Sequence, residues 1–157
     1  MAILLHEEGL YDKTTIYATD INEEVLHIAE LGTYPLKNMK NYTRNYLLAG
    51  GNDSFSKYYS ASYESASFHP FLKKNIVFAQ HNLVTDRSFN EFHAILCRNV
   101  MIYFDLELQN RVHELFYDSL SDSGILALGS KESINFSSRA SCYEILDNKE
   151  KIYRKMK

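Results

Sequence analysis

The sequence predicts an α/β fold with a largely parallel sheet, an antiparallel pair of strands at its C-terminal end and a small antiparallel insertion. Runs of β-branched and aromatic residues alternate with segments of helical period, which is the pattern of strands joined by crossover helices. Between residues 55 and 80 the pattern changes to alternating Tyr, Ser and Phe, which is typical of a hairpin. Two short apolar runs near the end of the chain predict a closing antiparallel pair.

Residues 1–32 predict a helix, a strand and a second helix. Residues 1–8 have the apolar spacing of the last turns of a helix. The β-branched and aromatic run at 14–19 predicts a strand. Residues 20–24 then supply an N-cap and an acidic first turn for a helix that continues to Leu31 and stops at Gly32. The predicted apolar face of this helix is formed by Val25, Leu26, Ile28 and Ala29.

Residues 35–80 predict short helices followed by a hairpin. Pro35 opens a segment of one or two short helices, which the turn cluster at 50–53 closes. Residues 55–71 predict an antiparallel hairpin with a turn at Glu64-Ser65. Residues 75–80 predict the next strand, so the hairpin is an insertion that leads back into the main sheet.

The second half of the chain predicts the rest of the main sheet. Residues 92–97 predict a strand, and residues 106–120 carry apolar side chains at the helical period. Residues 125–129 predict a central strand. The runs at 143–146 and 151–153 predict the closing antiparallel pair.

Length and composition limit the classes of protein to which the chain can belong. Its 157 residues suffice for one compact domain and are too few for two of ordinary size. Hydrophobic residues make up 45% and charged residues 24%, the balance of a folded globular protein. The net charge of −3 gives no general affinity for nucleic acid, so no nucleic-acid partner is expected. No apolar run suffices for membrane insertion and no secretion signal is visible, which favours a cytoplasmic protein.

Cysteine and histidine usage gives little support for a metal site. Cys97 and Cys142 lack metal-type spacing and are too few for a disulfide framework, which fits a reducing cytoplasm. No two of the six histidines stand three to five residues apart, so neither zinc nor another metal is expected.

Polar residues just beyond strand ends are the candidate functional residues, because ligands of open α/β sheets bind outside the carboxyl ends of the strands. Asp20 follows the first strand and is suited either to accept both hydroxyls of a ribose or to N-cap the next helix. Asn82 and Leu83 follow the strand at 75–80, where a side-chain amide and a backbone N–H suit the edge of an adenine. An Asx turn is the alternative for Asn82.

The stretch HAILCRNVMIYF, residues 93–104, contains the third candidate. Arg98 and Asn99 follow the strand at 92–97, where that strand would end at the cleft, and Tyr103 comes shortly before the next helix. A plain surface loop does not explain the renewed apolar run at 100–104, which favours a functional role for the Arg-Asn pair. Tyr103 is either functional or a packing aromatic whose hydroxyl reaches water.

Motifs for an acid, a base or a metal do not accompany these residues. The sequence shows no Ser-His-Asp arrangement, Walker loop, H-E-x-x-H or G-x-G-x-x-G. Adenosine-binding features without such groups favour group transfer from a cofactor that is already activated.

Four strings in order, IYATDINEEVLHIAELGTY, IVFAQHNL, FHAILCRNVMIYF and GILALGSKESI, resemble the CheR family of chemotaxis receptor methyltransferases. The resemblance runs from about residue 16 to residue 153, and C-R-N-V-x-I-Y-F is its most specific part. It implies a Rossmann-like S-adenosylmethionine methyltransferase sheet with a small antiparallel β-subdomain inserted at about 52–74. It also implies S-adenosylmethionine as cofactor, S-adenosylhomocysteine as product, and glutamate side chains of chemoreceptors as methyl acceptors.

The resemblance also assigns roles to the candidate residues. Tyr103 would stand near the transferable methyl group, which makes Tyr103 and Arg98 the catalytic candidates. Glutamate has a reference pKa of about 4.3 and is ionised at neutral pH, so the reaction needs no general base. The implied cofactor-binding residues are Asp20 for the ribose, Asn82 and Leu83 for the adenine, and Arg98 and Asn99 for the pocket wall.

The chain departs from the family pattern at its beginning and near residue 130. The family's methyltransferase domain starts with a strand and a Gly-rich turn ending in Gly-Glu-Glu, whereas MAILLHEEGL resembles the helix after that turn. We therefore expect an N-terminally truncated sheet, the C-terminal part of a CheR-type domain. The second departure is in the string G-S-K-E-S, which contains Lys131, whereas the family commonly has a shorter G-x-S-E pattern. Glu132 is then the counterpart of the family's Glu.

The implied partners are the cytoplasmic helices of chemoreceptors. In some family members a receptor's C-terminal peptide also adds a strand to the inserted subdomain. The short turn near Glu64-Ser65 argues against a dedicated site of this kind, but a receptor C-terminal peptide at the β-subdomain stays open as a second partner. Two other functions stay open: a catalytically inactive module that docks on a receptor or partner protein, favoured by the absent Gly-rich turn, and a methyltransferase with a small-molecule substrate.

Overall fold

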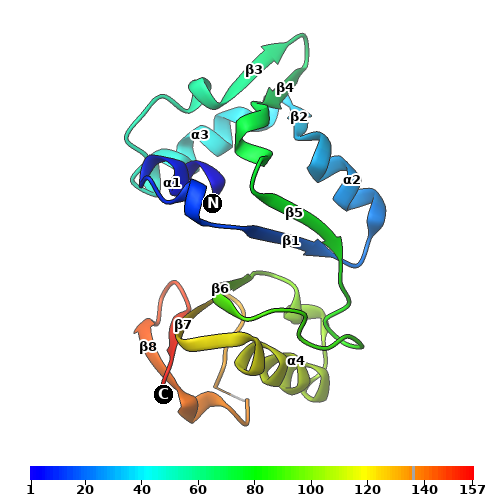
Figure 1. The fold of residues 1–157 in the computed structure, drawn as a ribbon, viewed down its shortest axis with the longest axis vertical. Helices are drawn as coiled ribbons and strands as arrows, with labels where there is room; N and C mark the ends of the chain where they lie inside the picture. The colour runs from blue at the N-terminus through cyan, green and yellow to red at the C-terminus, as the bar shows by residue number, and fades with distance from the viewer. Residues whose placement is uncertain (136) are drawn as a thin grey trace. The chain divides into compact units, whose positions relative to one another are not determined.

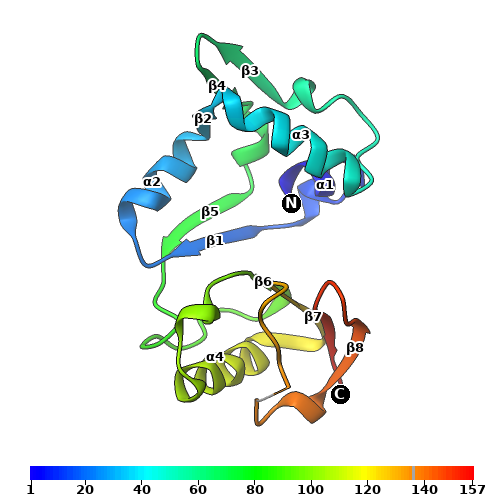
Figure 2. The ribbon, with the colours of Figure 1, turned by 180° about the vertical axis from the view of Figure 1, so that it is seen from behind.

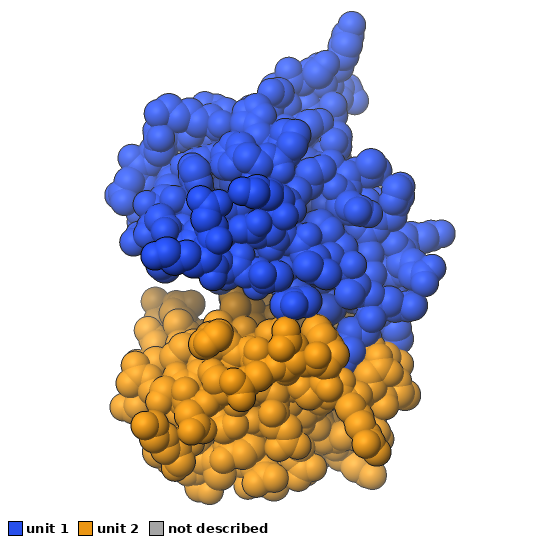
Figure 3. Space-filling model, viewed as in Figure 1, with its two compact units in different colours: residues 1–81 blue, residues 82–157 orange. Residues whose placement is uncertain are grey.

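The computed structural model describes residues 1–135 and 137–157, which form two compact units, residues 1–81 and 82–157 (Figure 3). Their strands make a parallel pair and a three-stranded sheet in unit 1 and a four-stranded sheet in unit 2 (Figure 1 and Figure 2). The mixed α/β class agrees with the sequence. The single main sheet that the sequence predicts is not present in the structure. Among the described residues β1 (Ile16–Asp20) and β6 (Phe92–Cys97) each pair with one strand, so the parallel strands lie in separate sheets.

Unit 1 contains the parallel pair formed by β1 and β5 (Ile76–Gln80), both predicted. The helix α2 (Glu23–Leu31) contacts both strands and ends at Gly32, whose φ of 66° is left-handed. Glycine adopts this conformation without the steric cost of a Cβ, which explains why the helix stops where the sequence predicts.

The predicted apolar face of α2 is only partly buried. Leu26 and Ala29 are half-buried, whereas Val25 is 47% exposed and Ile28 is 53% exposed. A sheet of two strands is too narrow to cover the whole apolar stripe of a helix. The prediction is therefore right for two of these residues and wrong for the other two.

The three-stranded sheet of unit 1 is antiparallel and has the order β2-β4-β3. The predicted hairpin consists of β3 (Tyr59–Ser62) and β4 (Ser65–Phe68), joined by a turn at Tyr63 and Glu64, one residue earlier than expected. The third strand, β2 (Thr33–Pro35), pairs with β4 and was not predicted.

Helices and aromatic side chains complete unit 1. The helices α1 (Ala2–Glu7) and α3 (Met39–Leu48) are both predicted. A 3-10 turn at Phe55–Tyr58 replaces the predicted start of the hairpin, because Phe55 and Tyr58 are buried in the core. That core comprises Met39, Phe55, Tyr58, Ala66 and Leu72. Further 3-10 turns lie at Tyr11–Lys13, Leu36–Asn38 and Pro70–Lys73.

Unit 2 is built on a sheet of order β6-β7-β9-β8. The strands β6 and β7 (Leu120–Leu128) are parallel and are joined through α4 (Leu106–Ser119). The strands β8 (Tyr143–Asp147) and β9 (Ile152–Lys155) form the predicted antiparallel pair near the end of the chain. β7 lies between β6 and β9, which agrees with its prediction as a central strand. None of the described helices in either unit is long and apolar enough to cross a membrane.

The core of unit 2 lies between α4 and the sheet and holds the loop after β6 in place. Asp105 caps α4 by accepting the Leu108 N–H at 2.9 Å. Short 3-10 turns lie at Met101–Tyr103 and Ala140–Cys142. The buried members of this core are Cys97, Met101, Val112, Phe116, Leu120, Leu126, Leu128, Ile134, Tyr143 and Tyr153.

Candidate functional site

Asp20 is the last residue of β1 and pairs in register with Gln80, the last residue of β5. Both therefore lie at the carboxyl edge of the parallel pair in unit 1. Asp20 Oδ1 accepts the Asn22 N–H at 2.9 Å, which makes an Asx turn. The N-cap predicted within residues 20–24 is Asn22, whose Oδ1 accepts the Glu24 N–H at 2.8 Å, so the alternative in which Asp20 itself caps α2 does not hold.

Asn82 follows β5 and begins unit 2. Its Oδ1 accepts the Val84 N–H at 2.9 Å, and its own N–H donates to Asp86 at 2.8 Å. The Asx turn that the sequence left as an alternative is therefore present. It uses the amide oxygen, and the Nδ2 group is a separate donor, so the turn and an adenine contact are compatible. Leu83 is half-buried and packs against the core of unit 2.

Arg98 and Asn99 follow β6 and are exposed. Asn99 has a φ of 61°, a left-handed conformation that Asn tolerates better than most residues. Tyr103 lies at the end of the next 3-10 turn and is 82% exposed, so the alternative of a packing aromatic does not hold, and its functional role stays a prediction. The apolar run at 100–104 is only partly packed: Met101 is buried, whereas Ile102 is 39% exposed.

Glu132, on the loop after β7, binds the loop after β6. Its Oε1 accepts the N–H groups of Val100 at 2.9 Å and Met101 at 2.8 Å. Its Oε2 accepts the N–H groups of Asn99 at 3.0 Å and Gly129 at 2.6 Å. The side chain is 5% exposed, so this buried carboxylate has backbone donors on both oxygens, as a buried charge requires.

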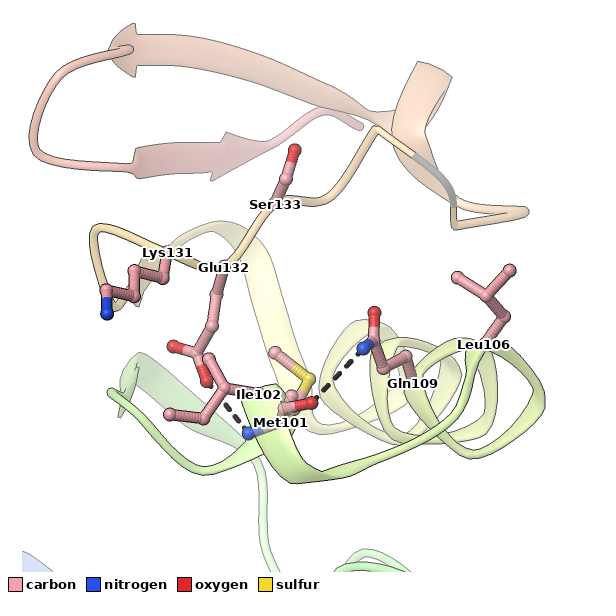
Figure 4. Close-up of a pocket in the computed structure, with 7 residues that line it drawn as sticks. All are labelled: Met101, Ile102, Leu106, Gln109, Lys131, Glu132 and Ser133. Carbon is pink, nitrogen blue, oxygen red and sulfur yellow. Dashed lines mark hydrogen bonds between the residues drawn. The ribbon is translucent and has the colours of Figure 1, made fainter.

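A hollow of about 230 Å³ lies beside this carboxylate (Figure 4). Gln109 of α4 closes one side by donating from Nε2 to the carbonyls of Met101 at 3.2 Å and Phe104 at 2.9 Å. The lining residues are Met101, Ile102, Leu106, Gln109, Lys131, Glu132 and Ser133. A single cation, a single carboxylate and apolar walls give the hollow both polar and apolar character.

Burial shifts the pKa of two groups near this loop so that the uncharged form is favoured. Burial, with a smaller effect of the Glu132 charge, raises the pKa of the Cys97 thiol to about 12, so this thiol stays protonated at neutral pH. Burial also lowers the pKa of His113 on α4. Across the described ranges 1–135 and 137–157, no three His, Cys, Asp or Glu side chains cluster in a way that could hold a metal ion.

The candidates divide between the two units. Asp20 belongs to unit 1, and the other five belong to unit 2. Within unit 2, the three candidates of the loop after β6 are held in one short segment by the contacts of Glu132 and Gln109. A family model described as "CheR methyltransferase, SAM binding domain" matches residues 1–151. The chain belongs to the CheR family. Membership confirms the resemblance seen in the sequence and places the chain in a class of S-adenosylmethionine-binding methyltransferases.

Relatives of this CheR-family chain are longer than it is. A Pseudomonas putida protein provisionally named methyltransferase Cher3 is 48% identical over 155 residues, which cover 99% of this chain and 57% of the relative. The chemotaxis protein methyltransferase of Escherichia coli is 33% identical over 78% of this chain and 41% of its own length. That of Borreliella burgdorferi is 34% identical over the same two shares. The chain thus spans 41% to 57% of these relatives.

Glu132 is the main feature that the sequence did not assign to the site of this CheR-family chain. The sequence offered one signal, the G-S-K-E-S string in which Glu132 takes the position of the family's Glu. That string does not reveal the partners of the carboxylate, because three of its four donors come from residues about thirty positions earlier.

Proposed function

We propose that the chain carries the methyl-transfer site of a protein-glutamate O-methyltransferase that uses S-adenosylmethionine and acts on chemoreceptors. One observation carries the proposal: in each unit of this CheR-family chain, taken by itself, the cofactor candidates lie at or just after the carboxyl end of a strand in a parallel pair, namely β1 and β5 in unit 1 and β6 in unit 2. Ligands of α/β sheets bind at such ends. Relatives named chemotaxis protein methyltransferase support the receptor as substrate.

The chemistry of the donor set fits S-adenosylmethionine. The Asp20 carboxylate would accept the two ribose hydroxyls, while Asn82 and the Leu83 N–H would pair with the adenine edge. Arg98 and Asn99 would form the pocket wall. When bound, S-adenosylmethionine supplies a methyl group that its sulfonium already activates.

The remaining work falls to groups that orient the acceptor. A glutamate side chain is ionised at neutral pH, so no residue has to remove a proton from it. The exposed Tyr103 hydroxyl and the Arg98 guanidinium are donors that can hold the carboxylate in line with the methyl group. Exclusion of water from this carboxylate would further raise its reactivity.

Receptor helices are the proposed partner, and the edge of β3 is a proposed second contact. β3 is one of the two outer strands of the three-stranded sheet, and its residues Ser60, Ala61 and Ser62 are exposed. An extended receptor peptide could add a strand there. The same edge favours the second candidate function, a catalytically inactive module that docks on a receptor or a partner protein.

Calorimetry with S-adenosylhomocysteine, the expected product, separates these functions. A methyltransferase site predicts micromolar binding to the chain and clear weakening by Asp20→Asn, which keeps an oxygen for the Asn22 N–H but removes the charge. The control is Asp12→Asn, because the Asp12 side chain is 85% exposed and forms a surface ion pair with Lys74. Equal affinity in Asp20→Asn and the native chain would contradict the ribose contact. Absence of binding by the folded chain would favour the docking module.

A further inference from the structure

Glu132 is the one carboxylate that is buried among residues 1–135 and 137–157. A buried charge is costly unless it is bonded, and its four donors are all backbone N–H groups. Figure 4 shows the side chain reaching from its own loop toward the N–H of Met101. The carboxylate thus links two loops, one after β6 and one after β7, that both leave carboxyl ends of parallel strands.

The loop after β6 has the backbone shape of an anion site. Asn99 is left-handed with a φ of 61°, and Val100 follows in the right-handed region with a φ of −105°. This alternation turns successive N–H groups to one side and makes a concavity that binds anions. Here the anion is internal, because Glu132 accepts the N–H groups of Asn99, Val100 and Met101.

Gly129 is an independent sign that the two loops are fitted to each other. A Cβ at this position would lie 2.7 Å from Asn99 Oδ1, 2.7 Å from Glu132 Oε2 and 2.8 Å from the Asn99 nitrogen. Contacts this short do not occur in folded proteins, so any larger residue would push the loops apart. The loops approach as closely as a glycine permits.

We propose that Glu132 is a positioning residue of the cofactor site: its carboxylate fixes the Arg98-Asn99 turn in its binding conformation before any ligand arrives. The proposal rests on the proposed function, because it assigns the turn to the cofactor pocket. Glu132 itself touches no ligand in this scheme. It acts through Asn99 and through the backbone that carries Arg98, so the ligand does not have to order this loop when it binds.

Amide hydrogen exchange followed by NMR tests the positioning role without any ligand. Glu132→Gln keeps the shape of the side chain but replaces one acceptor oxygen by a donor. We expect at least two of the amides of Asn99, Val100, Met101 and Gly129 to exchange about tenfold faster or more, since one lost charge-assisted hydrogen bond has an effect of this size. Amides in the middle of β7 should not change. Glu91→Gln, at an exposed carboxylate, should alter none of the four.

Calorimetry with S-adenosylhomocysteine tests the consequence for binding. Glu132→Gln should weaken binding about tenfold or more while the exchange of the β7 amides stays native, and Glu91→Gln should bind as the native chain does. A purely structural role would change stability without this selective loss of affinity. Failure of the native chain to bind would contradict the proposed function, whereas the positioning role would still be decided by the four amides.

Two results would overturn the proposal. One is native exchange at all four amides in Glu132→Gln, and the other is faster exchange with unchanged affinity. If Glu132→Gln does not fold, Glu132→Asp and Gly129→Ala give the same measurement, because the first shortens the link and the second separates the loops. Both should increase exchange at Asn99 and Val100, and native exchange in both variants would equally overturn the proposal.

Discussion

The ammonium of Lys155, in β9, donates to the carbonyl oxygens of Tyr117 at 2.8 Å and Leu120 at 2.7 Å, and lies 4.2 Å from the centre of the Tyr117 ring. These carbonyls are at the end of α4, where helix carbonyls lack intrahelical partners. A cation there also interacts favourably with the negative end of the helix dipole. Lys155 therefore joins the sheet of unit 2 to the C-terminal end of its helix.

Lys155→Met should lower the free energy of unfolding by about 1 to 2 kcal/mol, because methionine keeps an apolar stem but loses both charge-assisted hydrogen bonds. Urea unfolding followed by circular dichroism measures the change. Lys149→Met is the control, since the Lys149 side chain is 90% exposed. A loss below about 0.5 kcal/mol, the range of ordinary surface substitutions, would show that the Lys155 contacts add no net stability.

Gly32→Ala should destabilise unit 1 more than Gly9→Ala. Both glycines have a φ of 66°, where alanine costs about 1 to 2 kcal/mol. A Cβ on Gly32 would also lie 3.3 Å from Lys73 Cδ, and the Lys73 ammonium bonds the Glu30 carbonyl at 2.8 Å. A Cβ on Gly9 meets nothing within 4 Å in the described part of the chain. Urea midpoints of the two variants give the comparison, and a smaller loss for Gly32→Ala would contradict it.

Local signals predicted the elements of the fold, and long-range contacts decided the rest. α2 could be read from its acidic first turn and Gly32 because helix ends depend on nearby residues. β2 could not, since its three residues become a strand only by pairing with β4 about thirty positions later. Phe55 and Tyr58 were misread as a strand because buried aromatics in a 3-10 turn imitate the alternation of a hairpin.

The candidate site also combines features that a local sequence pattern predicts with features that depend on long-range contacts. Arg98 and Asn99 could be proposed from the sequence because they interrupt two apolar runs, which is a local pattern. The sequence left open whether Tyr103 packs, and its 82% exposure answers that question. The role of Glu132 depends on N–H groups from another loop, and no spacing rule in a single sequence encodes such a contact.

Stability of unit 1 should fall on acidification through Glu7. Its carboxylate accepts the hydroxyls of Tyr46 and, at 2.6 Å, Tyr58, and these hydrogen bonds lower the pKa of Glu7. A carboxyl whose pKa is lower in the folded state stabilises the fold above its unfolded pKa of about 4.3 and loses this contribution as pH falls through the folded value. Glu7→Gln should therefore remove part of the acid sensitivity.

Thermal midpoints of the native chain and Glu7→Gln between pH 7 and pH 3 measure this contribution. The native chain should be the more stable at pH 7, and the difference should shrink below about pH 4.3. Glu8→Gln, at the exposed neighbouring carboxylate, controls for the change in net charge. A difference between the native chain and Glu7→Gln that does not vary with pH would contradict the role given to the two tyrosine hydroxyls.

Cys97 should be inert to thiol reagents in the folded chain. It is 6% exposed, and burial raises its pKa to about 12. At pH 8 about one thiol in ten thousand is then ionised, and the thiolate is the reactive form. In Cys142→Ser, which keeps Cys97 as the single cysteine, a disulfide reagent should release colour only after urea is added. Cys97→Ser, which keeps the half-buried Cys142, should react faster when folded. Rapid reaction of folded Cys142→Ser would mean that the loop after β6 opens, and would count against its fixation by Glu132.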